Sequence, residues 1–322
     1  MTLAAQPKVK TLGDYACEGI EKHFKKILKY ETLVKKDEDP EALHQMRVGM
    51  RRLRTAVSRF SVAVTLPKVV SDKNIGKIAR CLGNLRDLDV LKEALKTNYE
   101  PHLTPKEQKS LQIAFDALGK QRKDALSDVQ AIFKDERYKS LKQEMKQWLE
   151  EPTYQPLASV AIQKVLPDLL LPEVSQFLLH QGWLVGTELR DSKLVICKGL
   201  DAEEIEKELA INGEKLHSLR KQAKRVRYQM ELFTDFYGES YASYLADVKN
   251  IQDILGSIQD SVVLAEWLEN ALSSEIQAQL PTLAAILAEN RYQLWQQWQP
   301  LQQKYGKGEN RQGLHLAILQ PT

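Results

Sequence analysis

A repeat at a fixed spacing is the feature that most constrains how this chain can fold. The segment LHQMRVGMRRLRTAVSRF begins at Leu43, and an altered copy, LHSLRKQAKRVRYQMELF, begins at Leu216. We call the interval from Leu43 to Leu216 the repeat offset. A second pair, LGNLRDLDVL from Leu82 and LGSIQDSVVL from Leu255, is separated by the same repeat offset. Two matched segments at one offset indicate an internal duplication, so the chain is expected to contain two related halves.

Each copy of the first segment has the periodicity of a helix with one cationic and one apolar face. At about 100° per residue, the cationic faces carry His44, Arg47, Arg51 and Arg54 in the first copy and His217, Arg220, Lys224 and Arg227 in the second. The opposite faces carry Met46, Met50, Leu53, Val57 and Phe60, and Leu219, Ala223, Val226, Met230 and Phe233. A helix that packs by one side and presents fixed cations on the other is suited to binding an anion.

The distribution of charge supports a local anion site. The chain of 322 residues has 46 Lys and Arg against 43 Asp and Glu, a net charge of +3. Residues 42–71 and 215–230 each contain six basic residues and no acid, and without these twelve the net charge would be −9. The basic residues are therefore concentrated in two stripes on an otherwise mildly acidic protein. Arg52 and Arg225 belong to these stripes and are also separated by the repeat offset.

The remaining pattern predicts an all-α fold. Helices are expected over 11–36, from 40 to before Pro67, over 71–98, from 105, and over 135–151, 202–237, 239–272 and 276–304. The single strand-like run is 193–197, and the tail from Gly306 is expected to be irregular. Prolines near 152–156 suggest a boundary between halves 1–154 and 155–322. The simplest architecture is two pseudo-twofold-related bundles of about four helices around a basic central cavity.

Other classes of protein find little support in the sequence. Three distant cysteines support neither a disulfide framework nor a CxxC metal site and fit a reduced, cytoplasmic compartment. No run is long and apolar enough for a membrane span. The phosphate-loop, GxGxxG, HExxH and GxSxG motifs are missing. We therefore expect no catalytic residue, metal or cofactor.

The matched histidines have two interpretations, a partly buried side chain satisfied by a neighbouring helix or a ligand contact. Metal binding by His44 or His217 is disfavoured, because each lies among cations and lacks a carboxylate at ligand spacing. The same positive charge should favour a neutral imidazole that can donate one hydrogen bond to a phosphate.

The second motif, Arg86-Asp87-Leu88-Asp89, looks like an acidic metal site, but its copy has Gln259 for Arg86 and Val262 for Asp89. Only Asp87 and Asp260 persist, and one carboxylate per copy is better suited to supporting an arginine of the basic helix. Further cations near this motif extend the predicted basic surface: Lys77, Arg80, Lys249 and, more remotely, Arg122.

A solvated helix face is the plain alternative for any run of charge. Three features favour an anion site instead: the stripes lack acids for i, i+4 ion pairs, they are mostly Arg, whose fork suits phosphate, and they recur after duplication.

The two basic segments resemble the two halves of a CHAD domain, the conserved-histidine α-helical domain. The resemblance is carried by HQMRVGMRRLRTAVSRF and HSLRKQAKRVRYQMELF, each of which is followed by an LG-x3-D segment. The resemblance covers about residues 11–305. It implies a basic central cavity that binds inorganic polyphosphate, and targeting to polyphosphate granules. Carried over by position, the binding residues would be His44, Arg47, Arg51, Arg52, Arg54, His217, Arg220, Lys224, Arg225 and Arg227. Many relatives carry an N-terminal triphosphate-tunnel domain, for which this chain has no room.

The expected function is non-enzymatic binding of polyphosphate. The alternatives are a binder of nucleic acid or another polyanion, which the shortage of aromatic residues in the stripes disfavours, and a metal-dependent phosphohydrolase. The sequence identifies no protein partner.

Overall fold

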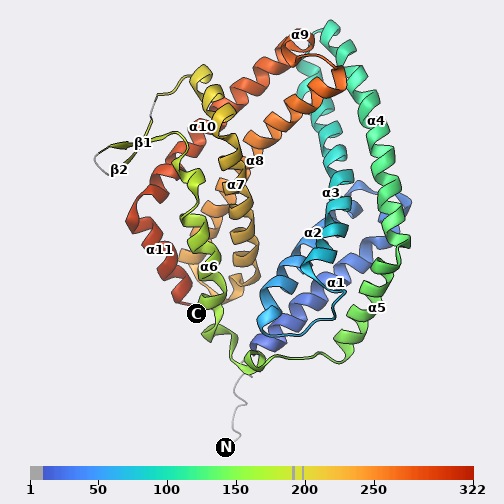
Figure 1. The fold of residues 1–322 in the computed structure, drawn as a ribbon, viewed down its shortest axis with the longest axis vertical. Coiled ribbons are helices and arrows are strands. Elements are labelled where there is room, and N and C mark those ends of the chain that lie inside the picture. The colour runs from blue at the N-terminus through green and yellow to red at the C-terminus, as the bar shows by residue number, and fades with distance from the viewer. Residues whose placement is uncertain (1–9, 191–192, 198) are drawn as a thin grey trace, which may run out of the picture. The chain divides into compact units, whose positions relative to one another are not determined.

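The computed structural model describes residues 10–190, 193–197 and 199–322, and within them the chain forms eleven α-helices and one small hairpin (Figure 1). The helices are α1 Leu12–Lys36, α2 Pro40–Arg59, α3 Asp72–Ala94, α4 Pro105–Lys134, α5 Glu136–Glu150, α6 Leu166–Leu178, α7 Ala202–Leu232, α8 Glu239–Leu272, α9 Ile276–Gln279, α10 Pro281–Gly306 and α11 Gly308–Leu319. Strands β1 Thr187–Arg190 and β2 Lys193–Ile196 pair antiparallel. The all-α prediction is confirmed, and β2 coincides with the predicted strand-like run.

The helices group into two compact units. Unit 1 takes in the chain up to Lys92 and Leu118–Leu166, and unit 2 takes in Glu93–Ala117 and Pro167–Thr322. The chain therefore passes from one unit to the other three times, and α4 contributes its first turns to unit 2 and the rest to unit 1. The predicted halves 1–154 and 155–322 describe the duplication, and that division stays a prediction.

Unit 1 begins with the helix hairpin α1–α2, whose ends follow from local chemistry. Thr11 and Asp14 form a capping box at the start of α1, and Asp37 ends the helix in the left-handed conformation, with φ 56°. Asp39 then accepts a hydrogen bond from the backbone of Glu41, with Pro40 in the first turn of α2. The tight connection lets α1 and α2 pack along their lengths (Figure 1).

Unit 1 is held together by side chains that reach from α5 to the hairpin. The Glu31 carboxylate is 6 % exposed and accepts hydrogen bonds from Tyr138 Oη at 2.9 Å and from Lys142 Nζ at 2.9 and 3.0 Å. The indole of Trp148 donates to the carbonyl of Thr65 at 2.9 Å. These contacts join segments far apart in sequence around the buried apolar faces of α1 and α2.

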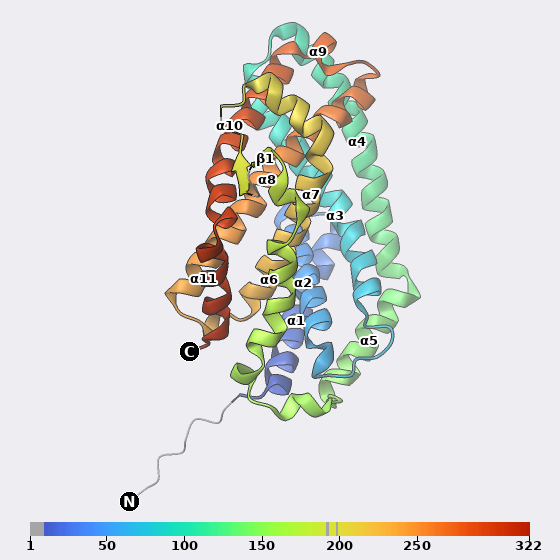
Figure 2. The same cartoon turned by 60° about the vertical axis from the view of Figure 1, so that its left-hand side comes forward.

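Unit 2 is built around α7, α8 and α10, of which α7 and α8 lie side by side (Figure 2). Its core contains stacked aromatic rings, with the centroids of Trp183 and Trp298 5.1 Å apart. The start of α4 also belongs to this unit. Glu107, 3 % exposed, accepts from Thr104 Oγ1 at 2.8 Å and from the backbone N–H of Thr282 at 2.7 Å, so one carboxylate caps both α4 and α10.

Three predicted boundaries in the second half are wrong. The helix expected to reach Tyr237 ends at Leu232 and is followed by a 3-10 turn. The stretch expected as one helix over 276–304 is two, because Pro281 starts α10 and Leu280, which precedes it, leaves the helical conformation with φ −138°. The tail expected to be irregular forms α11.

The repeat offset explains α11. Shifted by this offset, α2, α3, α4 and α5 fall on α7, α8, α10 and α11. The buried residues of α5 and α11 also correspond, since Leu141 matches Leu314 and Met145 matches Ile318, all at most 2 % exposed. The duplication therefore extends to the last helix of the chain.

Candidate functional site

The cationic face of α2 in unit 1 and that of α7 in unit 2 both stand opposite a buried apolar face. Every apolar residue predicted to pack is at most 6 % exposed: Met46, Met50, Leu53, Val57, Phe60, Leu219, Ala223, Val226, Met230 and Phe233. The arginine side chains opposite are partly exposed, from 18 % for Arg227 to 45 % for Arg54. Burial of the apolar side fixes the rotation of each helix and thereby determines which residues face outward.

One arginine of each basic helix is supported by the second motif in the same way. In unit 1, Arg47 Nη2 lies 3.2 Å from Asp87 Oδ1 on α3. In unit 2, Arg220 Nη2 lies 3.6 Å from Asp260 Oδ1 on α8. The prediction that the persistent aspartate supports an arginine of the basic helix is therefore confirmed.

The glycine of the LG-x3-D segment lies against the same arginine in each unit, tightly in unit 2 and at an ordinary contact distance in unit 1. A Cβ atom at Gly83 would lie 3.5 Å from Arg47 Nε, and one at Gly256 would lie 3.1 Å from Arg220 Nε. Each guanidinium thus lies against a neighbouring helix at a glycine and is held by an aspartate one turn further on. This geometry accounts for the spacing of glycine and aspartate in the motif.

These ion pairs orient the guanidinium groups without using all their donors. The carboxylate groups of Asp87 and Asp260 belong to side chains that are 68 % and 72 % exposed, so solvent screens both pairs. A guanidinium has five N–H donors, and the contact described in each pair uses one nitrogen. A preoriented arginine with spare donors can bind a phosphate at little entropic cost.

The last arginine of each cationic face, Arg54 on α2 and Arg227 on α7, is paired differently in the two units. Arg54 makes a two-point contact with Asp72 on α3, with Nε–Oδ1 at 2.6 Å and Nη2–Oδ2 at 2.9 Å. Arg227 instead pairs with Glu231 on its own helix at 2.8 Å and lies 3.6 Å from Asp253 on α8. The cationic face in unit 2 is therefore closer to neutral than the duplicated sequence suggests.

The other predicted cations lie on the same pairs of helices. Arg51 and Arg52 on α2 and Lys224 on α7 are half-buried. Four more are exposed and have no ion pair with any described residue: Lys77 and Arg80 on α3, Arg225 on α7 and Lys249 on α8. Lys77 and Arg80 thus add positive charge to the α2–α3 surface. Asp253, one repeat offset after Arg80, reverses that charge in unit 2.

Both matched histidines are partly buried and have a lowered pKa. Burial is the main cause for His44, and the charges of Arg86, Arg47 and Arg51 add to it against the opposing effect of Glu41. Burial is also the largest cause of the lowered pKa of His217. The Nδ1 atom of this histidine is buried and has no hydrogen-bond partner among the described residues. Neutral imidazoles are the expected form at pH 7, and each can offer one N–H to an anion.

Arg122 lies in a different environment from the other predicted site residues. Its guanidinium donates to both oxygens of Asp37, at 2.8 and 2.9 Å, and through Nε to Asp89 at 2.6 Å, and these hydrogen bonds raise its pKa. It therefore joins the end of α1 to α3 and α4 inside unit 1. In unit 2 the matched position is Trp295, fully buried in the core. We assign Arg122 a structural role.

The structure adds three residues that are not among the predicted binding residues. Burial lowers the pKa of His44, and the charge of Arg86 is the largest cationic contribution to that shift, so Arg86 is within electrostatic range of the histidine. His23 and Lys26 on α1 are within electrostatic range of Arg52. A row of lysines on α1 at helical spacing, Lys22, Lys26 and Lys29, is the sequence signal that could have revealed this part of the surface.

Two features of the described residues bear on catalysis. No group of three or more His, Cys, Asp or Glu side chains among them could hold a metal ion. His180 Nε2 lies 3.0 Å from Ser218 Oγ, but His180 Nδ1 already accepts from the backbone N–H of Gly182 at 3.0 Å. The Nε2 atom of the neutral ring must then carry the proton, so this histidine cannot act as a base toward the serine.

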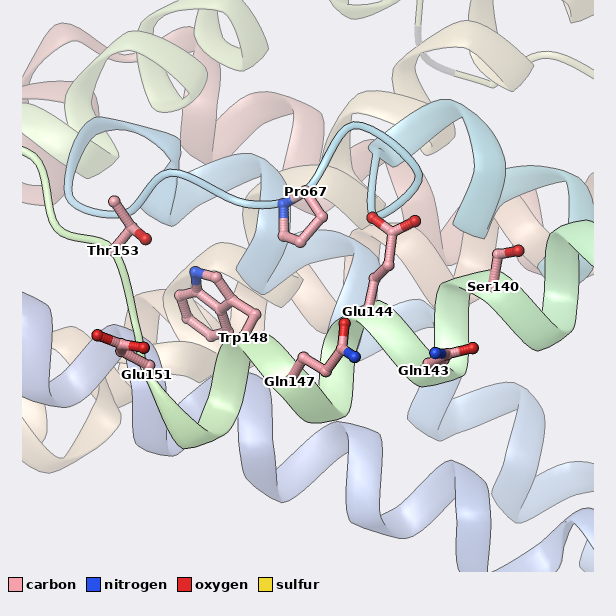
Figure 3. Close-up of a pocket in the computed structure, with 8 residues that line it drawn as sticks. All are labelled: Pro67, Ser140, Gln143, Glu144, Gln147, Trp148, Glu151 and Thr153. Carbon is pink, nitrogen blue, oxygen red and sulfur yellow. The ribbon is translucent and has the colours of Figure 1, made fainter.

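One surface cavity of about 520 Å³ lies along α5 in unit 1 and differs in character from the basic faces (Figure 3). Glu144 points toward the loop that carries Pro67, and the ring of Trp148 lies near Pro67. Glu151 and Thr153 lie beyond Trp148, at one end of the cavity lining. The lining contains two carboxylates and no Lys or Arg, which makes this cavity unsuitable for a polyanion.

Among the helices of the described chain, none has the length and apolar character needed to cross a membrane.

Comparison with known proteins places this geometry in a family. The chain is similar to the crystal structure of the CHAD domain from the plant Ricinus communis, with 22 % identity, a TM-score of 0.55, and coverage of 99 % of this chain and 96 % of that one. It is also similar to PptA from Streptomyces chartreusis, with 14 % identity, a TM-score of 0.64, and coverage of 92 % and 100 %. These similarities show the fold. No curated protein matches the chain. The family model for the CHAD domain matches residues 18–269, which include both basic helices and both LG-x3-D segments, and the chain therefore belongs to the CHAD domain family.

Proposed function

We propose that this protein binds inorganic polyphosphate through the cationic faces of α2 and α7, without catalysing a reaction. The observation that carries the proposal is the repeated arrangement of a preoriented arginine, Arg47 on Asp87 and Arg220 on Asp260, next to a neutral histidine and further cations. A planar guanidinium that is already held in place suits the closely spaced phosphates of a linear polyanion.

Counterion release supplies the driving force for such binding. A chain with about one charge per phosphate sheds condensed cations when Arg and Lys replace them, as other charged polymers do. Affinity should therefore increase with chain length and fall steeply with salt. The duplication further predicts that both faces line one basic cavity, and the resemblance to the CHAD family implies that the protein associates with polyphosphate granules. Both statements remain part of the proposal.

Titration calorimetry against polyphosphates of graded length tests the proposal. We expect tight binding of long chains, weaker binding of triphosphate, and a decrease in log K with log[salt] of about 0.7 to 0.9 for every phosphate contacted. An affinity that does not depend on length or salt would reject the counterion mechanism. Phosphate release in the presence of added divalent metal ions would reveal a phosphohydrolase.

Nucleic acid is the second candidate ligand, since its phosphates could engage the same cations. Single-stranded binding normally adds aromatic side chains on which bases stack. The aromatic residues within the two stripes, Phe60 and Tyr228, are 0 % and 7 % exposed and thus unavailable for stacking. Polyphosphate is therefore expected to displace a labelled single-stranded RNA from the protein, and the reverse outcome would favour nucleic acid.

A further inference from the structure

The basic helix has a different neighbour in each unit, and the difference begins at one pair of matched positions. In unit 1, α1 and α2 approach closely at Gly49, where a Cβ atom would lie 3.1 Å from Ile27 Cγ1 and 3.5 Å from the carbonyl oxygen of His23. In unit 2 the residue one repeat offset later is Gln222. Its amide donates to the Glu173 side chain of α6 at 2.9 Å. The close contact in unit 1 thus brings the whole face of α1 up to α2.

The face of α1 that comes with this contact is cationic. Lys22 is exposed and Lys26 is half-buried, and neither forms an ion pair with a described residue. The carboxylates on α1 that could neutralise them are engaged elsewhere: Glu18 by Lys10, Glu21 by Lys25, and Glu31 by Lys35 and Lys142. The two lysines are one helical turn apart and can therefore contact one ligand.

Arg52 connects this pair to the stripe on α2. It lies three residues after Gly49, the point of close approach to α1, and therefore on the same side of α2. Burial lowers the pKa of His23 and Lys26, and the charge of Arg52 adds to both shifts. Arg51 and Lys29 also lower the pKa of Lys26, while Glu41 opposes the shift. The cationic surface of unit 1 therefore continues from α2 onto α1.

The corresponding neighbour in unit 2 carries the opposite charge. The sequence of α6, LPDLLLPEVSQFL, contains Asp168 and Glu173 but no Lys or Arg. The residues that the repeat offset matches to Lys22 and Lys26 are Val195 and Gly199. The basic helix α7 thus adjoins a helix that contributes the Glu173 carboxylate and has no Lys or Arg in its sequence.

From this difference we infer that the polyphosphate site of unit 1 extends from α2 onto α1, where Lys22, Lys26 and Arg52 bind phosphates, and that unit 2 has no equivalent extension. The inference rests on the proposed function and assigns three residues of the same ligand's binding site. It makes unit 1 the half that contacts more phosphates and accounts for more of the salt dependence.

The test compares two double variants of equal charge change in the full-length protein. Lys22→Gln with Lys26→Gln removes the proposed contacts, and Lys25→Gln with Lys139→Gln removes two exposed lysines of unit 1 that pair with Glu21 and Glu136. Binding of long-chain polyphosphate is measured by calorimetry over a series of salt concentrations. Circular dichroism confirms that each variant is folded.

We expect the first variant to bind about tenfold more weakly and to show a slope of log K against log[salt] that is smaller by about 1.5, while the control changes less than about twofold. If the wild-type protein fails to bind polyphosphate, the proposed function itself is wrong. If the wild type binds but the Lys22/Lys26 variant keeps its affinity and slope, or the control loses as much, the extension onto α1 is rejected and the proposed function stands.

Discussion

The basic faces of units 1 and 2 derive from one duplicated segment, yet their surroundings have diverged. Both retain an arginine held by an aspartate and placed beside a glycine. Around that shared element, unit 1 adds cations from α1 and α3, whereas unit 2 places Glu231 and Asp253 against Arg227 and Glu173 beside α7. The comparison shows that the geometry of one ligand-facing arginine persisted while the charge around it changed.

A consequence is that the two units are expected to contribute unequally to one function. A polyanion gains most where several uncompensated cations lie close together, because each displaced counterion adds to the binding free energy. Unit 1 meets this condition better. Substitutions at matched positions of the two units can measure this inequality.

Charge reversal at matched positions should have the largest effect. Arg51→Glu and Lys224→Glu each place a carboxylate in a stripe, and the double variant should lose about 4 kcal/mol of binding free energy, roughly a thousandfold in affinity. Arg51→Glu alone should cost more than Lys224→Glu, because the face around Arg51 is more strongly cationic. Calorimetry on folded variants measures this. Equal losses of affinity in the two single variants would show that the units contribute equally. A folded double variant with unchanged affinity would show that these residues do not form the binding site.

Burial of His23 among cations should also make the stability of unit 1 sensitive to acid. Burial lowers the pKa of His23 to about 4 from an ordinary 6.5, with Arg52, Lys22 and Lys26 contributing. The unfolded chain binds this proton more readily, so the stability of the neutral form is complete above pH 6.5 and is lost as the pH falls toward 4. The loss should reach about 3 kcal/mol.

Urea unfolding at several pH values measures this dependence, and His23→Gln serves as the reference variant because it leaves the carboxylates unchanged. The wild type should lose more stability than the variant between pH 6.5 and 4. Parallel curves for the two proteins would show that His23 is not the group responsible. Hydrogen exchange should place the additional loss in α1 and α2.

Arg122 offers a structural contrast between the units. Replacement by Met leaves Asp37 and Asp89 without their shared counter-charge, so unit 1 should lose about 2 to 3 kcal/mol of unfolding free energy. Affinity for polyphosphate, measured below the unfolding temperature, should stay within about twofold of the wild type because Arg122 serves the fold. A stable Arg122→Met variant that binds polyphosphate more weakly would show that Arg122 contributes to ligand binding.

Alanine substitutions at Gly83 and Gly256, the glycines of the two LG-x3-D segments, should cause the smallest changes in stability and affinity. Alanine in a helix interior is favoured over glycine by about 1 kcal/mol. At Gly83 the added Cβ makes an ordinary contact, so Gly83→Ala should stabilise the protein and leave affinity unchanged. At Gly256 the contact with Arg220 is tight, so Gly256→Ala should gain less stability and weaken binding about twofold. Thermal unfolding and calorimetry on the pair distinguish these outcomes.

Local patterns in the sequence were sufficient for most of the helices and for the orientation of the two stripes. The Thr11 and Asp39 caps, Pro40 and the apolar rows of α2 and α7 act over a few residues, and the structure confirms them. The support of Arg47 by Asp87 could also be predicted, because the duplication singled out one persistent aspartate. The missed helix α11 was predictable in principle, since the repeat offset places it on α5.

Periodicity, capping and spacing are encoded in neighbouring residues, so they were enough to identify a duplicated helical protein of the CHAD domain family with two cationic helix faces. The neighbour of each face could be found only from the folded chain: α1 with Lys22 and Lys26 in unit 1, and α6 with Glu173 in unit 2. It also decided that Arg122 bridges Asp37 and Asp89 inside the fold. The physical reason is that packing partners are chosen by shape and charge over long stretches of chain, whereas helical spacing shows only which residues share a face.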